Sequence, residues 1–153
     1  MEIQQAIELR RSIRAYGDRP VEREKLEAVL RAGNQAPIFG RLHMSVFAGP
    51  EQLQAVDAAA LVVLSAPGGL DEKGFNMANV SCAAENMLLA AAGLGLGSCF
   101  LIGPMAAFSD PALRARLELP EGYEPLVGVA LGYAALERPA APERTDAGIT
   151  WCR

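Results

Sequence analysis

The segment that most constrains the fold of this 153-residue chain is its longest predicted helix, residues 77–94. This helix is apolar on nearly every side. A helix of that kind is buried in the middle of a fold or in an oligomer interface. Its most apolar run, residues 87–96, is much too short to span a bilayer. We therefore expect other elements of the chain, or a second copy, to surround it.

Hydrophobic periodicity divides the rest of the chain into short helices and strands. Helices are predicted over residues 2–10, 21–32, 51–57 and 110–117. Strands are predicted over residues 43–49, 60–66, 98–103 and 125–134. A short strand at 148–152 would pair with another chain. Gly33 is expected to cap the second helix, and Asp110 with Pro111 to begin the last one. This order predicts one domain over 1–153, with helices covering a sheet.

Composition limits the class of protein. Hydrophobic residues make up 51% of the chain and the formal net charge is −4, which excludes disorder and argues against nucleic-acid binding. The N-terminal residues lack the apolar core of a secretion signal, so a cytoplasmic location is expected without membrane association. Cys82, Cys99 and Cys152 lack metal-site spacing. We expect free thiols, with Cys82 and Cys99 in the core, and no metal.

The stretch "LRRSIRAYGDR", residues 9–19, places four arginines and a serine at one point of an acidic chain. Such a charge run is either a solvated face or an anion site. Guanidinium groups form charge-assisted, often bidentate bonds to phosphate, and a serine hydroxyl adds a donor. Neither a P-loop nor a G-x-G-x-x-G pattern is present, and "GLGLG" is predicted to end a helix. The anion predicted by this cluster is thus a small phosphate monoester.

Five segments together resemble one family, the nitroreductase family of FMN-dependent oxidoreductases. "LRRSIRAY" is similar to its N-terminal R-R-S-x-R-x-F motif, and "EREKLEAVLRAGNQAPIFGR" to its second helix and following loop. "ENMLLAAAGLGLGSCFLIG" resembles the long central helix and next strand. "PEGYEPLVGVALGYA" and "PERTDAGITW" resemble its late strand and tail. The resemblance covers essentially the whole chain, which is identified as a short member.

The resemblance implies an α+β fold, a three-layer α/β/α sandwich in which helices flank a mixed, mainly antiparallel sheet. It also implies an intertwined homodimer with FMN at the interface. Such an assembly would explain both the apolar central helix and the tail, residues 136–153, which is rich in Pro and Ala and has little core of its own.

The resemblance further implies the residues that bind FMN. Arg10, Arg11 and Ser12 would hold its phosphate, and Arg14 would reach the ribityl chain or the flavin N1/O2 edge. The amides of Ile102 and Gly103 would face N5 and O4. A loop of the partner subunit would lie near the flavin ring. The complete implied set is Arg10, Arg11, Ser12, Arg14, Pro37, Ile38, Phe39, Arg41, Leu101, Ile102, Gly103 and Arg144. No side-chain acid or base is implied.

The function implied is reduction of nitroaromatics, quinones or similar acceptors by NAD(P)H. Hydride would pass through flavin N5 in a ping-pong cycle, and the cofactor carries the chemistry. Three alternatives stay open. They are another flavin reaction (dehalogenation, azoline oxidation or flavin fragmentation), a flavin-binding protein without turnover, and an interaction protein that has lost FMN.

Two departures from the family pattern affect the site. Arg41 and His43 stand where the family loop commonly has Asn and Gln, which leaves the contacts to the flavin's pyrimidine edge open. A lone His at a strand start is more often structural. Larger relatives also carry a helical excursion over the active site, and here residues 67–76 replace it. We expect a more open site, or one covered by another segment.

Overall fold

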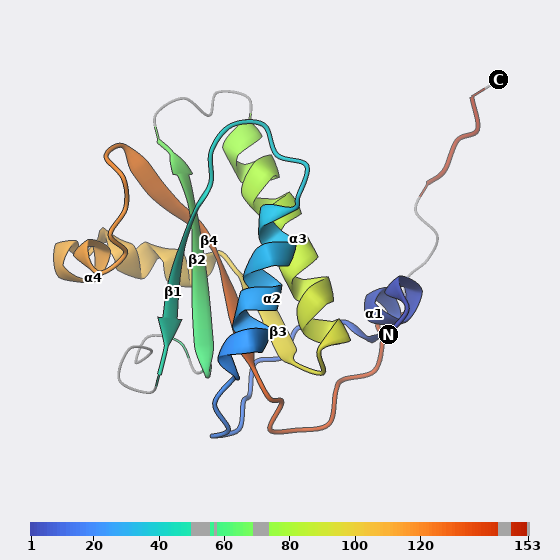
Figure 1. The fold of residues 1–153 in the computed structure, drawn as a ribbon. Coiled ribbons are helices and arrows are strands. Elements are labelled where there is room, and N and C mark those ends of the chain that lie inside the picture. Colours follow the sequence, from blue (N-terminus) through green and yellow to red (C-terminus); the bar gives the residue numbers. More distant parts are fainter. Residues whose placement is uncertain (50–55, 57, 69–73, 144–147, 153) are drawn as a thin grey trace.

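A computed structural model describes residues 1–49, 56, 58–68, 74–143 and 148–152 of the chain. Four α-helices, one 3₁₀-helix and four strands are formed in these ranges. In chain order they are α1 (Ile3–Leu9), α2 (Arg23–Asn34), β1 (His43–Ala48), β2 (Ala60–Pro67), α3 (Phe75–Gly93), β3 (Gly97–Leu101), η2 (Gly103–Ser109), α4 (Pro111–Ala115) and β4 (Tyr123–Gly132). Figure 1 shows the sheet behind α2 and α3, with α1 set to one side.

The four strands form one sheet in the order β1-β2-β4-β3, and every neighbouring pair is antiparallel. A single parallel bridge joins Ser12 to Ser98 at the β3 edge. β2 is buried along almost its whole length, as its continuous apolar sequence predicts. The predicted mixed, mainly antiparallel sheet is therefore confirmed.

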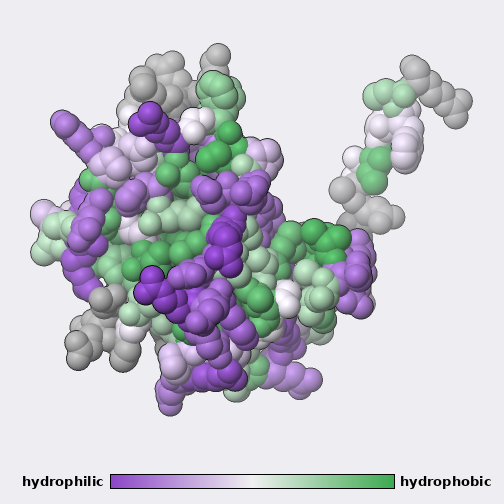
Figure 2. Space-filling model, in the orientation of Figure 1, coloured by the Kyte–Doolittle hydropathy of each residue, from purple (hydrophilic) through white to green (hydrophobic). Residues whose placement is uncertain are grey.

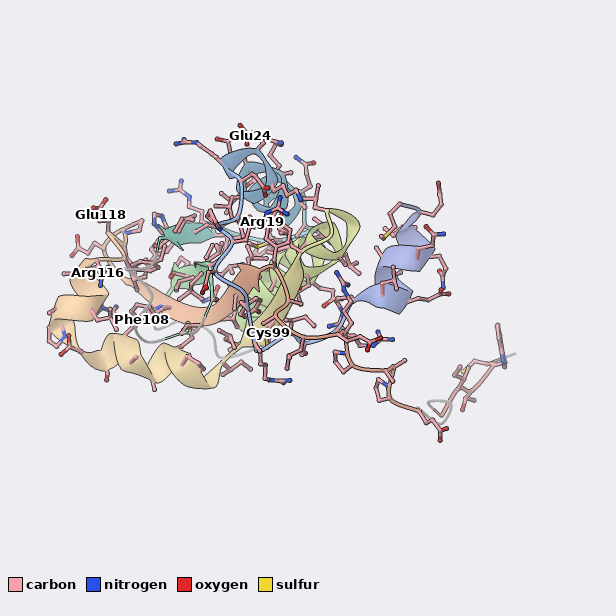
Figure 3. The ribbon with its side chains drawn as sticks, turned by 90° about the horizontal axis from the view of Figure 1, so that it is seen from below. Arg19, Glu24, Cys99, Phe108, Arg116 and Glu118 are labelled. Atoms are coloured by element: carbon pink, nitrogen blue, oxygen red, sulfur yellow. The ribbon has the colours of Figure 1, made fainter. Side chains whose placement is uncertain are left out.

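Helices cover both faces of the sheet, so the domain has three layers. Alternate residues of β2 point into two separate cores. Val62 and Leu64 belong to the core under α2 and α3, whereas Leu61 and Val63 belong to the core under η2 and α4. In Figure 3, Glu24 of α2 and Phe108 of η2 lie on opposite sides of the sheet. The predicted α+β sandwich is confirmed.

α3 is the long helix that the apolar run predicts, and its buried side chains include Val80, Met87 and Leu88. It ends before Gly95, whose φ of +77° turns the chain into β3. Two expectations about single residues, Cys82 and Gly33, are wrong. Cys82 is exposed on α3, because that face of the helix is turned away from the core.

Gly33 lies inside α2 and does not end it. A Cβ at this position would lie 2.8 Å from Cγ and Sδ of Met87 on α3. Its missing side chain thus allows α2 and α3 to pack closely, which is a tertiary role that no local cap pattern reveals. The N-cap prediction at Asp110 is confirmed, since its carboxylate accepts a hydrogen bond of 2.8 Å from the Leu113 N–H.

Three further differences concern whole segments. η2 was not predicted, and it begins with a Gly-Pro pair directly after β3. The helix expected over 51–57 lies almost wholly outside the described residues. Residues 148–152 form no strand in this chain and lie away from the main body (Figure 1).

None of the helices described is long and apolar enough to cross a membrane.

Candidate anion site

The arginine segment, which we define as Arg10–Arg14, follows α1 and runs beside the beginning of β3. Ile13 N–H donates to the Ser98 carbonyl at 2.9 Å. Just beyond the segment, Gly17 N–H donates to the Tyr133 carbonyl at 2.8 Å, and Ala135 N–H donates to the Ala15 carbonyl at 3.0 Å. Hydrogen bonds to the ends of two strands therefore fix the backbone of this stretch.

Two glycines make room for this stretch on the sheet. A Cβ on Gly97 would lie 3.0 Å from the side chain of Ile13, and a Cβ on Gly132 would lie 2.7 Å from the Tyr16 ring. Ile13 is buried, and the Tyr16 hydroxyl donates to the Ile13 carbonyl at 2.6 Å. Ile13 and Tyr16 thus face the protein, whereas Arg14 between them is exposed.

The three arginines of the segment are only partly neutralised. Arg10 Nε lies 3.4 Å from Glu85 Oε1 on α3, and Arg11 Nη1 donates to the Arg10 carbonyl at 2.6 Å. Arg11 Nε is buried without a hydrogen-bond partner in the described part of the chain. Arg14 is exposed. A buried, unpaired N–H costs free energy until an acceptor reaches it, so this arrangement favours a bound anion.

A fourth guanidinium at this place was missed by the sequence analysis. Arg138 follows β4, and its Nη1 and Nη2 donate to the carbonyls of Leu9 and Leu96, each at 3.1 Å. The only local signal is that Arg138 is one of three arginines in the Pro- and Ala-rich tail. The tail arginine that the resemblance implies, Arg144, lies outside the described residues.

A polar cluster holds the far end of this stretch. Tyr133 hydroxyl donates to Glu22 Oε2 at 2.7 Å, and Arg19 Nη2 donates to Glu22 Oε1 at 2.6 Å. Lys25 Nζ donates to the Tyr133 hydroxyl at 2.9 Å. The hydrogen bonds that the Glu22 carboxylate accepts, from Tyr133 foremost and then from its own backbone and Arg19, lower its pKa to about 2. The cluster joins α2 to the end of β4.

The predicted flavin-contacting loop lies elsewhere. Phe39 N–H donates to Asn79 Oδ1 at 3.0 Å, and the Asn79 amide donates to the Phe39 carbonyl. Asn79 and Glu85 are six residues apart on α3, about 240° around its axis, so the loop and the arginine segment contact different faces of this helix. Within the described residues, no hydrogen bond or ion pair joins them. One chain therefore does not bring Pro37–Phe39 to Arg10.

The remaining predicted residues take different positions. Leu101 ends β3, and the exposed pair Ile102–Gly103 follows it. The backbone predicted to face flavin N5 therefore comes directly after the strand whose Ser98 binds Ile13. Arg41 is exposed, and His43 at the start of β1 lies edge-on to Tyr123, with ring centroids 6.3 Å apart. This ring contact is a packing interaction.

The short connection that replaces the family's excursion begins at the end of β2 and ends at the start of α3. Asn76 Nδ2 donates to the Pro67 carbonyl at 2.6 Å, which ties its two ends together. In the described ranges, no group of three His, Cys, Asp or Glu side chains could hold a metal ion.

Comparison with known proteins agrees with this architecture. A family model described as the nitroreductase family matches residues 7–66 and 42–133. A protein of Archaeoglobus fulgidus named "Putative NADH dehydrogenase/NAD(P)H nitroreductase" is 34% identical over 145 residues, covering 84% of this chain and 83% of that protein. A protein of the same name from Methanothermobacter thermautotrophicus is 30% identical over 162 residues, covering 95% of this chain and 84% of that one.

Solved structures share the fold over the full length. A nitroreductase with bound FMN from Bacteroides fragilis is 28% identical, with a TM-score of 0.84 and 100% of both chains covered. A nitroreductase with bound FMN from Desulfitobacterium hafniense, 20% identical, shows the fold alone, with a TM-score of 0.88 and the same coverage. The fold defines a three-layer α+β protein, and the arginine segment is its candidate anion site. The chain belongs to the nitroreductase family.

Proposed function

We propose that this protein is an FMN-dependent oxidoreductase of the cytoplasm that uses NAD(P)H to reduce nitroaromatics, quinones or similar acceptors. The observation that carries the proposal is the arginine segment. Three guanidinium groups and a serine stand within five residues, and among the described residues the one carboxylate that pairs with them is Glu85. Solved family members that bind FMN support the cofactor.

The residues present fit the phosphate of FMN. This phosphate carries about −1.5 to −2 charge near pH 7 and offers three acceptor oxygens. Arg11 Nε is a buried donor that lacks an acceptor among the described residues, and Arg14 is exposed beside it. We assign phosphate binding to Arg10, Arg11 and Ser12.

Bound FMN would supply hydride transfer through N5, between NAD(P)H and the acceptor. The chain would supply binding and electrostatics. Arg14 would place a positive charge at the N1/O2 edge and so favour an anionic reduced flavin. The amides of Ile102 and Gly103 would donate to the flavin edge around N5 and O4. No protein acid or base is assigned, because protons can come from water.

The complete site requires two copies of the chain. Pro37–Phe39 are tied to a face of α3 away from the arginine segment, so they would reach the flavin of the partner subunit. Apolar side chains of α1 and of the tail lie at the surface (Figure 2), including Ile3, Ile7 and Trp151. Their burial against a second copy would stabilise a homodimer. Each copy would be one FMN-binding domain over 1–153.

The test compares the wild type with Arg10→Ala/Arg14→Ala. The matched control is Arg23→Ala/Arg31→Ala, which removes two exposed arginines from α2. We expect a yellow wild-type protein that releases FMN and oxidises NAD(P)H when an acceptor is added. The first variant should bind FMN at least about 100-fold more weakly, because two charge-assisted contacts are lost. The control should bind as the wild type does.

Three outcomes would overturn parts of this proposal. A wild-type protein that neither contains nor takes up FMN would exclude the flavin function. FMN binding without NAD(P)H oxidation would favour the flavin-binding protein without turnover. Equal FMN affinity in the two double variants would show that the arginine segment is a solvated face.

A further inference from the structure

Arg138 occupies an unusual place in the chain. It is half-buried, whereas its neighbours Glu137 and Pro139 are exposed. Both terminal nitrogens of its guanidinium are used, one on each of two backbone carbonyls. A tail of 21 residues after β4 thus makes specific contact with the N-terminal part of the fold at this side chain.

The two carbonyls flank the arginine segment. Leu9 is the last residue of α1 and directly precedes Arg10. Leu96 directly precedes β3, two residues before Ser98, which pairs with Ser12 and accepts the hydrogen bond from Ile13. The guanidinium therefore connects the beginning of the segment to the same strand that holds its middle.

The end of α1 is also held through α3, because Arg10 pairs with Glu85 and α1 contacts this helix. Among the described residues, Arg138 is the side chain that joins this point to the residue before β3. At Arg10 the chain leaves the helix and becomes extended, with φ −60° and ψ 125°. The main-chain contacts to β3 begin only at Ser12. Without Arg138, the end of α1 would be held through α3 alone, and the arginines would lose more conformational entropy when they converge on one phosphate.

Resting on the proposed function, we propose that Arg138 is a positioning residue for the phosphate anchor. It preorganises Arg10 and Arg11 by bridging the end of α1 to the start of β3. A planar guanidinium suits this role, because its two terminal nitrogens donate in fixed, divergent directions. A lysine would keep the positive charge without reproducing this fork.

The experiment measures dissociation constants of FMN and riboflavin for the apoprotein by flavin fluorescence. Riboflavin lacks the phosphate, so the ratio of the two constants isolates the phosphate contribution. The variants are Arg138→Ala, Arg138→Lys and the matched control Arg31→Ala. We expect both Arg138 variants to weaken FMN binding about tenfold, with riboflavin binding and the control unchanged. A merely structural residue would move both ligands together.

Each other outcome contradicts the proposal in a different way. Parallel loss of FMN and riboflavin binding with a lower Tm would show a structural role only. Wild-type behaviour of Arg138→Lys would show that charge, not the bridge, matters. An unchanged ratio in Arg138→Ala would exclude any role. Arg10→Ala serves as the reference: if it also leaves the ratio unchanged, the phosphate anchor itself is wrong.

Discussion

At the scale of single residues, the absence of side chains matters as much as their presence. Gly132 and Gly97 leave the space that the Tyr16 ring and Ile13 fill, and these two side chains hold the arginine segment against the sheet. Glycine is normally unfavourable inside a strand. Here it is required because another segment crosses the strand ends closely.

Gly132→Ala should therefore destabilise the fold by about 1–3 kcal/mol, since the added methyl overlaps the Tyr16 ring and the tyrosine must move. FMN retention should fall with it. Urea unfolding measures the change. The control is Gly93→Ala in α3, where the methyl meets no atom within 4 Å; it should be neutral or stabilise by up to about 1 kcal/mol. Equal stability of both variants would contradict the close approach.

The residues of the site were only partly predictable. Arg10–Arg14 stand together in the sequence, so their charge pattern is visible there. Arg138 and Gly33 act through partners that are distant in the chain, Leu9 and Met87. No local pattern contains such contacts. The exposure of Cys82 was missed for a different reason, because helix periodicity is weak in a segment that is apolar on most sides.

At the scale of elements, α2 is joined to the end of β4 by the cluster around Glu22. The carboxylate accepts from Tyr133 and Arg19, and its pKa is about 2 instead of the usual 4.5. Because the folded protein binds this proton less readily than the unfolded chain, the stabilisation is fully present above about pH 4.5. It is lost as the pH falls toward 2.

Glu22→Gln should thus lower the free energy of unfolding at pH 7 and have a progressively smaller effect between pH 4.5 and pH 2. Urea unfolding of both proteins across this range measures the difference. Glu24→Gln is the control, because Glu24 lies on the outer side of α2 (Figure 3). A constant difference between wild type and Glu22→Gln at all pH values would contradict the assigned pKa.

Most elements were predicted correctly and with bounds that differ by only a few residues. β2 and α3 are long apolar segments, and the N-cap of α4 has a clear Asp-Pro signature. η2 was missed, because a 3₁₀ turn has little periodicity of its own. The strand expected at 148–152 is not formed within the described chain. A strand requires a neighbouring strand to pair with. In the proposed dimer, the partner subunit would supply that strand.

At the scale of the whole molecule, apolar side chains remain at the surface of α1 and the tail. Ile3, Ile149 and Trp151 are each more than 70% exposed, which is costly in water. We expect light scattering to give a mass of twice the 16.2 kDa of one chain. Ile149→Ser/Trp151→Ser should weaken the dimer and its FMN binding together, whereas Thr150→Ser should change neither. A monomeric wild type that binds FMN fully would contradict the shared site.

The contacts of Arg10–Arg14 also have a consequence for the order of events during synthesis. The segment leaves the ribosome well before Ser98, which binds its Ile13. It also precedes Tyr133, Ala135 and Arg138, which bind the residues on either side of it. A nascent chain therefore carries the arginines long before it can assemble their framework. If the arginine segment binds the phosphate as proposed, the cofactor would be captured only after β4 and Arg138 have been made. A product truncated before β4 would then lack the framework of the proposed phosphate site.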